Sequence, residues 1–157
     1  MTVDELTDAR ALFGAARDAR RDNERISRAI DRLRAREGLR AASLAPTGRG
    51  SCGIADANAA TDARMAYEED DAPRVADNDA TISQARAVLL GLAAILGQGE
   101  ADVLRWRYVE ALSWDATSLM CSRSIRSCQD HANAALDFID SNGIGATARG
   151  IDSVGNG

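Results

Sequence analysis

Three side chains in the C-terminal third of the chain have the types and spacing of a zinc site. Cys121, Cys128 and His131 form a C-x6-C-x2-H pattern, and thiolate and imidazole groups are ligands that zinc prefers. A zinc site needs four protein ligands, or three and a water, and Cys52 lies far along the chain in a segment expected to be a loop. We therefore expect no metal and no cofactor. Cys121 and Cys128 are interpreted as free thiols that replace larger apolar side chains in the core.

The sequence offers little for catalysis. A Ser-His-Asp arrangement would have to use His131, the single His of the chain, and no nucleophile elbow is present. The Gly-rich stretch at residues 48–53 lacks a P-loop Lys, because the chain contains no Lys at all. The acidic run "EEDD" at residues 68–71 fits no EF-hand spacing and reads as a solvated charged surface. We expect that the protein is not an enzyme.

A second set of side chains is suited to contacts with DNA. Arg126 can pair with a guanine edge, Gln129 and Asn133 can pair with adenine, and Ile125 can pack on a thymine methyl group. If a helix begins after Ser124, these side chains lie near its exposed N-terminal end. The candidate DNA-contacting residues are Arg123, Ser124, Ile125, Arg126, Ser127, Gln129 and Asn133.

The same segment carries side chains that would favour DNA binding and side chains that would oppose it. The candidates for phosphate contacts are Arg123, Ser124 and Ser127. Asp130, Asp137 and Asp140 lie further along the expected helix, where carboxylates disfavour a deep fit into a groove lined by phosphates. The segment therefore carries features both for and against DNA binding.

The elements that must position these side chains are helical. Apolar residues recur every three or four positions over residues 3–42 and 74–96, and residues 9–33 carry the heptad spacing of a coiled coil. Three shorter helices are expected at residues 101–112, 114–121 and 125–140. The predicted fold is all-α, a long antiparallel helical hairpin followed by a helix-turn-helix of three short helices. The expected organisation is a long N-terminal helix (1–42), a flexible acidic linker (43–73), a second hairpin helix (74–98), the helix-turn-helix (100–141) and a disordered tail (142–157).

Local signals define the turns of the expected C-terminal module. Ser113 and Ser124 are good N-cap residues for the second and third short helices. Tyr108 and Trp114 flank the first turn and are interpreted as core anchors. Gly143 is suited to end the third helix, because glycine readily adopts a left-handed conformation.

Composition and charge narrow the class of protein. The chain has 157 residues and a net charge of −5, which argues against a general polyanion binder. Residues 1–50 carry 11 Arg and 8 acids, whereas residues 51–80 carry 2 Arg and 8 acids. The longest apolar run has ten residues, at 87–96, so we expect no membrane span. The first residues lack the apolar core of a signal peptide, which predicts a cytoplasmic protein.

Residues 104–139 resemble region 4 of sigma-70-type factors, and they are most similar to small phage-encoded regulators of the ArpU-like late-operon type. The matching positions are Arg107, Tyr108, Leu112, Ser113, Trp114, Ser124, Ala135 and Leu136, with Ser127 in place of a Thr. The departures are Thr117, Ser118, Cys121, Ser122 and Cys128, where that pattern has Ile, Ala, Leu or Met, Gly, and Val or Ile. The smaller side chains predict a less stable motif, because they bury less apolar area.

The resemblance implies a transcription regulator that reads double-stranded DNA with its third short helix. It also implies RNA polymerase as a second partner. The uncovered apolar stripe of the hairpin predicts a homodimer. A different class stays open, a non-enzymatic phage structural or interaction protein, such as a small packaging subunit or an adaptor, that works through the hairpin.

Overall fold

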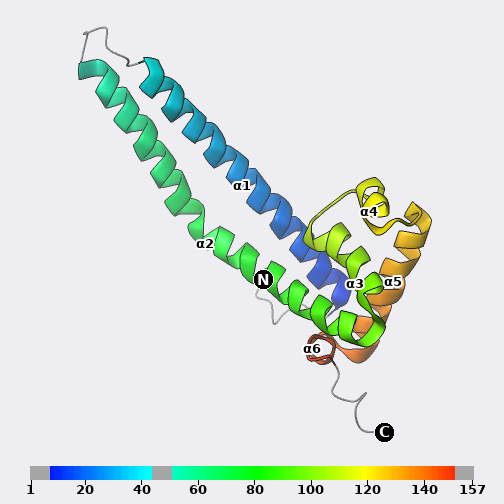
Figure 1. The fold of residues 1–157 in the computed structure, drawn as a ribbon. Helices are drawn as coiled ribbons and strands as arrows, with labels where there is room; N and C mark the ends of the chain where they lie inside the picture. Colours follow the sequence, from blue (N-terminus) through cyan, green and yellow to red (C-terminus); the bar gives the residue numbers. More distant parts are fainter. Residues whose placement is uncertain (1–7, 44–50, 151–157) are drawn as a thin grey trace. The chain divides into compact units, whose positions relative to one another are not determined.

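The computed structural model describes residues 8–43 and 51–150 of the chain. These residues form six α-helices, one π-helical segment and no strand (Figure 1). The elements are α1 Ala9–Ser43, α2 Ser51–Leu96, α3 Gln98–Leu104, η2 Arg105–Val109, α4 Trp114–Cys121, α5 Ile125–Asn142 and α6 Ile144–Ala148. The prediction of an all-α fold is confirmed. The chain divides into unit 1, Met1–Arg21 with Asn78–Gly157, and unit 2, Asp22–Asp77.

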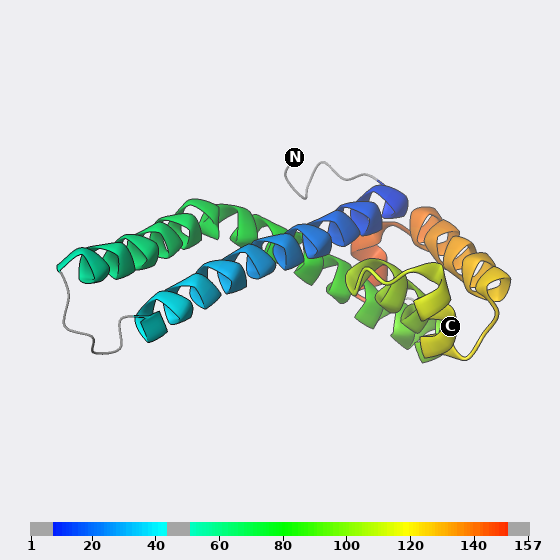
Figure 2. The ribbon, with the colours of Figure 1, turned by 90° about the horizontal axis from the view of Figure 1, so that it is seen from above.

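Unit 2 consists of the C-terminal part of α1 and the N-terminal part of α2, which lie side by side in two perpendicular views (Figures 1 and 2). Among the described residues, three ion pairs connect the two helices. As the partner on α1 lies later in the sequence, its partner on α2 lies earlier. The pairs are Asp22–Arg74, Arg34–Glu68 at 3.2 Å and Glu37–Arg64 at 3.0 Å. The order of the pairs shows that the helices of unit 2 are antiparallel.

The flexible linker predicted for residues 43–73 is wrong over its larger part. Helix α2 begins at Ser51 and continues through Pro73, while residues 44–50 lie outside the described residues. A proline inside a helix costs about 3 kcal/mol through the lost backbone hydrogen bond and ring clash. Ion pairs of Arg64 and Arg74 with α1 flank this proline. The tertiary contacts and the Ala-rich sequence around them keep the segment helical despite its local signals.

One helix among the described residues, Asn58–Leu96, is long and apolar enough to cross a membrane by length and composition alone. Its Ile82, Val88 and Leu92 are buried in the core of unit 1, and core helices of soluble proteins meet the same criterion. The absence of a membrane partner stays a prediction.

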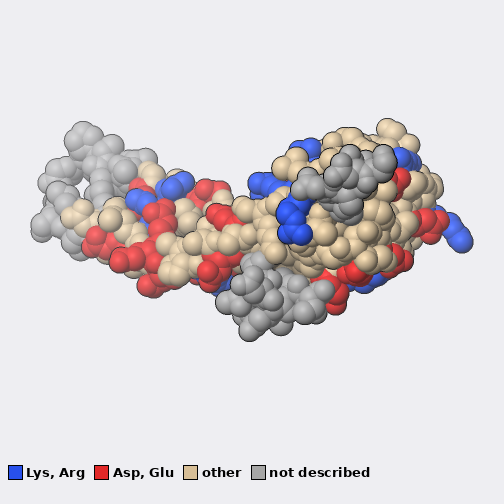
Figure 3. All heavy atoms as spheres, turned by 90° about the horizontal axis from the view of Figure 1, so that it is seen from below, with Lys and Arg blue, Asp and Glu red and all other residues tan. Residues whose placement is uncertain are grey.

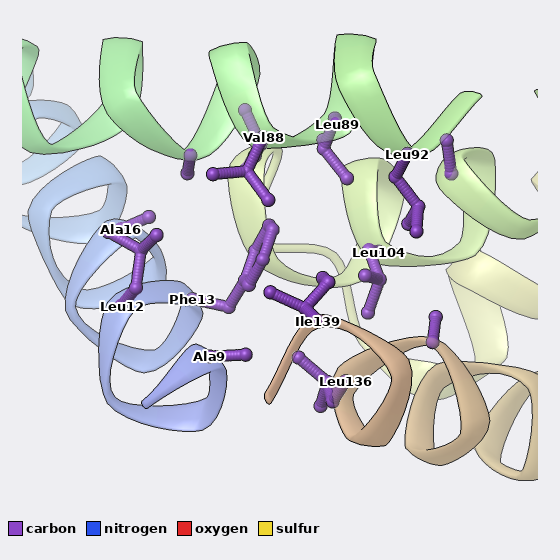
Figure 4. Packing of buried hydrophobic residues seen from close by; sticks show 14 of the residues in the cluster. Ala9, Leu12, Phe13, Ala16, Val88, Leu89, Leu92, Leu104, Leu136 and Ile139 are labelled. Atoms are coloured by element: carbon purple, nitrogen blue, oxygen red, sulfur yellow. The ribbon is translucent and has the colours of Figure 1, made fainter. Parts of the chain in front are cut away.

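The core of unit 1 joins α1, α2, α3 and α5 (Figure 4). Phe13 lies between Val88 of α2 and Ile139 of α5, and all three side chains are fully buried. The buried positions on α1 within unit 1 are Ala9, Leu12, Phe13, Ala16 and Ala19, and all except Phe13 belong to the heptad positions predicted from the sequence. This core holds the N-terminal part of α1 against the C-terminal helices.

The helix predicted at residues 101–112 is shorter and is followed by a wider turn. Helix α3 ends at Leu104, and η2 continues with π-helical geometry, in which the Glu110 amide donates to the Arg105 carbonyl at 2.9 Å. A π-turn inserts an extra residue and shifts which side chains face inward. Val109 is thereby fully buried, and the backbone then turns at Ala111, whose φ is 56°.

The disordered tail predicted for residues 142–157 is wrong for residues 144–148. These residues form α6, in which Thr147 is fully buried, while residues 151–157 lie outside the described residues. Gly143, at φ 88°, makes the turn between α5 and α6. The tail packs because α2 offers a glycine, Gly91, against which the Thr147 backbone lies directly.

Candidate nucleic-acid interface

A short capped helix precedes the candidate DNA-contacting segment. The Ser113 hydroxyl accepts a hydrogen bond from the Ala116 amide at 3.2 Å, which caps α4 as predicted. Trp114, the first residue of α4, packs against the core, and the Arg107 guanidinium lies 4.6 Å from the centre of its ring. Tyr108 packs against the core as well, edge-on to Phe13 with ring centres 6.0 Å apart. The interpretation of both aromatic residues as core anchors is confirmed.

A tight turn connects α4 to α5. Ser122 adopts a left-handed conformation, at φ 52°, which glycine adopts more readily than other residues. The Arg123 amide donates to the Ser118 carbonyl at 3.1 Å, and the Ser118 hydroxyl donates to the Arg123 carbonyl. The Ser118 hydroxyl therefore stabilises a turn that lacks the usual glycine.

Helix α5 starts with the predicted cap. The Ser124 hydroxyl accepts a hydrogen bond from the Ser127 amide at 3.1 Å. The inner face of α5 is formed by Cys128, Ala132, Ala135, Leu136 and Ile139, all buried. Because this face is packed, the opposite face of α5 and its first turn are directed to solvent.

The structure brings most of the candidate DNA-contacting residues to this exposed end. Ser124, Ile125, Arg126 and Asn133 are exposed, whereas Ser127 and Gln129 are half-buried. A shallow hollow of about 500 Å³ lies beside them. Its lining residues are Ser124, Arg126, Ser127, Asp130, His131 and Ala134.

Arg123 is oriented differently from the other candidates. Its Nη2 would lie 3.1 Å from a Cβ placed on Gly99 of α3, so its guanidinium packs against that helix. Its Nη1 is buried without a hydrogen-bond partner among the described residues. The position of Arg123 therefore indicates a role in packing the turn against α3, and its guanidinium is poorly placed to contact a phosphate.

Two of the three acids on α5 are engaged inside the protein. Asp137 forms an ion pair with Arg10 at 2.9 Å. Asp140 accepts a hydrogen bond from the Ala9 amide at 2.6 Å and so caps the start of α1. Asp130 makes no ion pair within the described part of the chain and lies exposed next to the first turn. The repulsion expected between α5 and phosphates is thus concentrated in Asp130.

The structure describes two of the cysteines and the histidine, which pack in the protein or contact a carboxylate. Cys121 is half-buried and Cys128 fully buried, and both are free thiols. Burial raises the pKa of the Cys121 thiol, and the nearby Cys128 raises it further. The His131 Nδ1 lies 2.9 Å from the Glu100 carboxylate. Within residues 8–43 and 51–150, no group of three or more His, Cys, Asp or Glu side chains is placed to hold a metal ion.

Sequence reasoning missed two exposed apolar side chains next to the turn. Leu119 is 81% exposed and Met120 is 51% exposed, both on the last turn of α4. The spacing of apolar residues did not predict their exposure, because α4 has only eight residues and is too short to show a clear helical period. Comparisons with protein-family models, with curated proteins and with solved structures found no match to this chain.

Proposed function

We propose that this protein binds double-stranded DNA and regulates transcription, as a regulator of phage or prophage type. The observation that carries the proposal is the exposed, Ser124-capped start of α5 with Arg126, followed two helical turns later by the exposed Asn133. In helix-turn-helix proteins, this end of the second helix of the motif enters the major groove. The role in transcription and the contact with RNA polymerase are proposed from the resemblance of residues 104–139 to region 4 of sigma factors.

The local geometry from α4 to α5 supports a helix-turn-helix arrangement. Helix α4 has eight residues, ends at the left-handed Ser122, and is followed by the 18-residue α5. Both helices begin with a serine cap that was expected from the sequence. A capped, closed turn fixes the direction of α5, which a groove reader requires.

The charge distribution favours unit 1 over unit 2 as the DNA-binding part. In Figure 3, acidic side chains gather over the described part of unit 2, while the surface of unit 1 on the same face is mainly uncharged. Among the residues of α2 in unit 2 whose side chains are described, the acids are Asp62, Glu68, Glu69, Asp70, Asp71 and Asp77. A phosphate backbone is repelled by such a surface.

The test of this proposal is the replacement of Arg126 by alanine. The full chain first selects its preferred duplex from a random-sequence pool, and each variant is then titrated against that duplex and a scrambled one at two salt concentrations. Arg126→Ala is expected to cost about 1–3 kcal/mol on the selected duplex, if the guanidinium reads a guanine edge. Arg149→Ala, which removes another exposed arginine, is the matched control and is expected to bind like the wild type.

Two outcomes would remove the proposal. One is a failure of the full chain to enrich any duplex from the pool. The other is an Arg126→Ala variant that binds the selected and scrambled duplexes with wild-type affinities.

A second candidate function, a protein-binding adaptor, is favoured by the exposed Leu119 and Met120. Apolar side chains grouped at a turn are typical of protein contact surfaces. Affinity capture with the wild-type chain and with Leu119→Glu separates the candidates. If Leu119→Glu loses a captured protein but keeps its duplex affinity, the adaptor role exists beside DNA binding.

A further inference from the structure

Several arginines of unit 1 form no ion pair within the described residues, and three of them lie on the neighbouring elements α1 and η2. They are Arg17 and Arg21 on α1 and Arg107 on η2, and none forms an ion pair within the described residues. Arg10 and Arg20, in the same stretch of α1, each pair with a carboxylate, at 2.9 and 3.3 Å. Arginines with and without a carboxylate partner therefore alternate along this stretch of α1.

Contacts between α1 and η2 bring the three arginines together. The ring of Phe13 lies edge-on to that of Tyr108, with centres 6.0 Å apart. Arg17 follows Phe13 by one helical turn and Arg21 follows by two, while Arg107 directly precedes Tyr108. Arg20 of α1 also forms an ion pair with Glu110, the residue that directly follows η2. This is a second contact between the same part of α1 and the η2 segment. The flank of α1 that carries Arg17 and Arg21 therefore lies alongside Arg107.

The Arg107 guanidinium is held in a fixed orientation. Its Nη1 donates to the Leu112 carbonyl at 2.7 Å, and its plane lies over the Trp114 ring at 4.6 Å. These two contacts leave its other N–H groups available, because a guanidinium has five N–H donors. A guanidinium held in this way is preorganised for an anion.

The three side chains carry positive charges that lie near one another and that no ion-pairing carboxylate of the described residues neutralises. The Nε of Arg17 is buried and has no acceptor among the described residues. Burial lowers the pKa of Arg107, and the positive charges of Arg17 and Arg21 lower it further. Asp18, next to Arg17, forms no ion pair within the described residues. Asp22, next to Arg21, and Glu110, three residues after Arg107, pair with other arginines. Like charges are thus gathered without a compensating group.

We infer that Arg17, Arg21 and Arg107 form a binding site for a phosphate group. Guanidinium groups match the geometry of phosphate oxygens and form paired, charge-assisted hydrogen bonds with them. The phosphate can come from the backbone of a duplex or from a free phosphate ion. The site does not include Arg126, so the inference can be tested separately from the proposal that α5 reads bases.

Trp114 provides a direct reporter of the site. The chain has two Trp residues, so Trp106→Phe leaves Trp114, which lies under Arg107, as the single emitter. Titration of this variant with inorganic phosphate is expected to give a saturable change in emission and a rise in Tm that saturates at the same concentration. Adding Arg17→Gln and Arg21→Gln abolishes both responses.

A matched control distinguishes a site from a general charge effect. Arg32 and Arg36 have the same i,i+4 spacing on α1 and no ion pair in the described structure, so Arg32→Gln with Arg36→Gln is expected to keep both responses. At low ionic strength without phosphate, the Arg17 and Arg21 double variant is expected to have an equal or higher Tm than its parent, because it relieves repulsion. A structural role for these arginines would lower the Tm instead.

A duplex titration separates the two sources of phosphate. If only the duplex changes Trp114 emission, the ligand is the backbone, and the Arg17 and Arg21 double variant lowers the salt slope of binding by about two units. If inorganic phosphate suffices, the site takes a free anion. Arg126→Ala leaves either response unchanged, so failure of the α5 proposal is distinguishable. No response to phosphate or duplex, or responses that the double variant retains, overturns the inference.

Discussion

Gly91 of α2 and Thr147 of α6 approach so closely that no side chain fits between them. A Cβ placed on Gly91 would lie 1.7 Å from the Thr147 carbonyl oxygen. Gly91→Ala is therefore expected to displace α6 and to destabilise the fold by about 1–3 kcal/mol, the usual cost of overpacking. Urea denaturation followed by circular dichroism measures the change.

Gly14 is the matched control for that substitution. It lies inside α1, and a Cβ there would meet nothing within 4 Å. Gly14→Ala is expected to stabilise the protein by about 0.5–1 kcal/mol, since alanine is the better helix former. Equal effects of the two substitutions would show that α6 does not pack on α2.

Asp140 connects the end of α5 to the start of α1. Its carboxylate accepts from the Ala9 amide at 2.6 Å and lies 3.5 Å from the Arg10 guanidinium. Asp140→Ala is expected to cost about 0.5–2 kcal/mol of stability, as the loss of a helix N-cap does. Asp130, on the same helix, makes no such contact within the described residues. Asp130→Ala is therefore expected to leave the midpoint of urea denaturation unchanged. A similar loss in both variants would argue against capping by Asp140.

The pH dependence of stability is expected to carry a contribution from Cys121. Burial raises the pKa of its thiol above the ordinary value of 9.0. Because the folded state holds the proton more tightly than the unfolded state, this stabilisation is fully present below the unfolded-state pKa. It is lost as pH rises through the folded-state pKa.

The measurement is the Tm of the wild type and of Cys121→Ala at neutral and at alkaline pH. The wild type is expected to lose more Tm than the variant between the two conditions. Identical losses would mean that the Cys121 thiol is not buried enough to favour its neutral form.

Asp130 and Arg123 are expected to affect DNA binding differently, because Asp130 is exposed whereas the Arg123 guanidinium packs against α3. Asp130→Ala is expected to keep or improve duplex affinity, because an exposed carboxylate beside phosphates is repulsive. Arg123→Ala is expected to lower the Tm with little change in the salt slope, since its guanidinium packs on Gly99. A salt slope reduced by about one unit in Arg123→Ala would instead indicate a phosphate contact.

Self-association through unit 2 is the fifth expectation. Leu39 is 72% exposed and Met65 is 56% exposed, and a two-helix unit with such side chains buries more apolar area as a dimer. Sedimentation is expected to show a dimer that Leu39→Glu with Met65→Glu dissociates. Leu119→Glu, in unit 1, is the control and keeps the dimer. A wild-type monomer at tens of micromolar would exclude the dimer.

The sequence by itself determined the class of fold and the starts of α4 and α5. The apolar spacing on α1 predicted the buried Leu12 and Ala16, and the caps at Ser113 and Ser124 were found as expected. These features depend on residues within one or two helical turns of each other, so a single stretch of sequence contains all the information that they need.

Only the tertiary structure decided features that depend on residues far apart. Helix α2 continues through Pro73 because α1 supplies ion partners on both sides of it, and α6 forms because Gly91 leaves room for it. The direction of the Arg123 side chain and the grouping of Arg17 with Arg107 likewise follow from packing between helices. Local patterns do not contain such contacts, because burial and pairing energies arise only when distant segments meet.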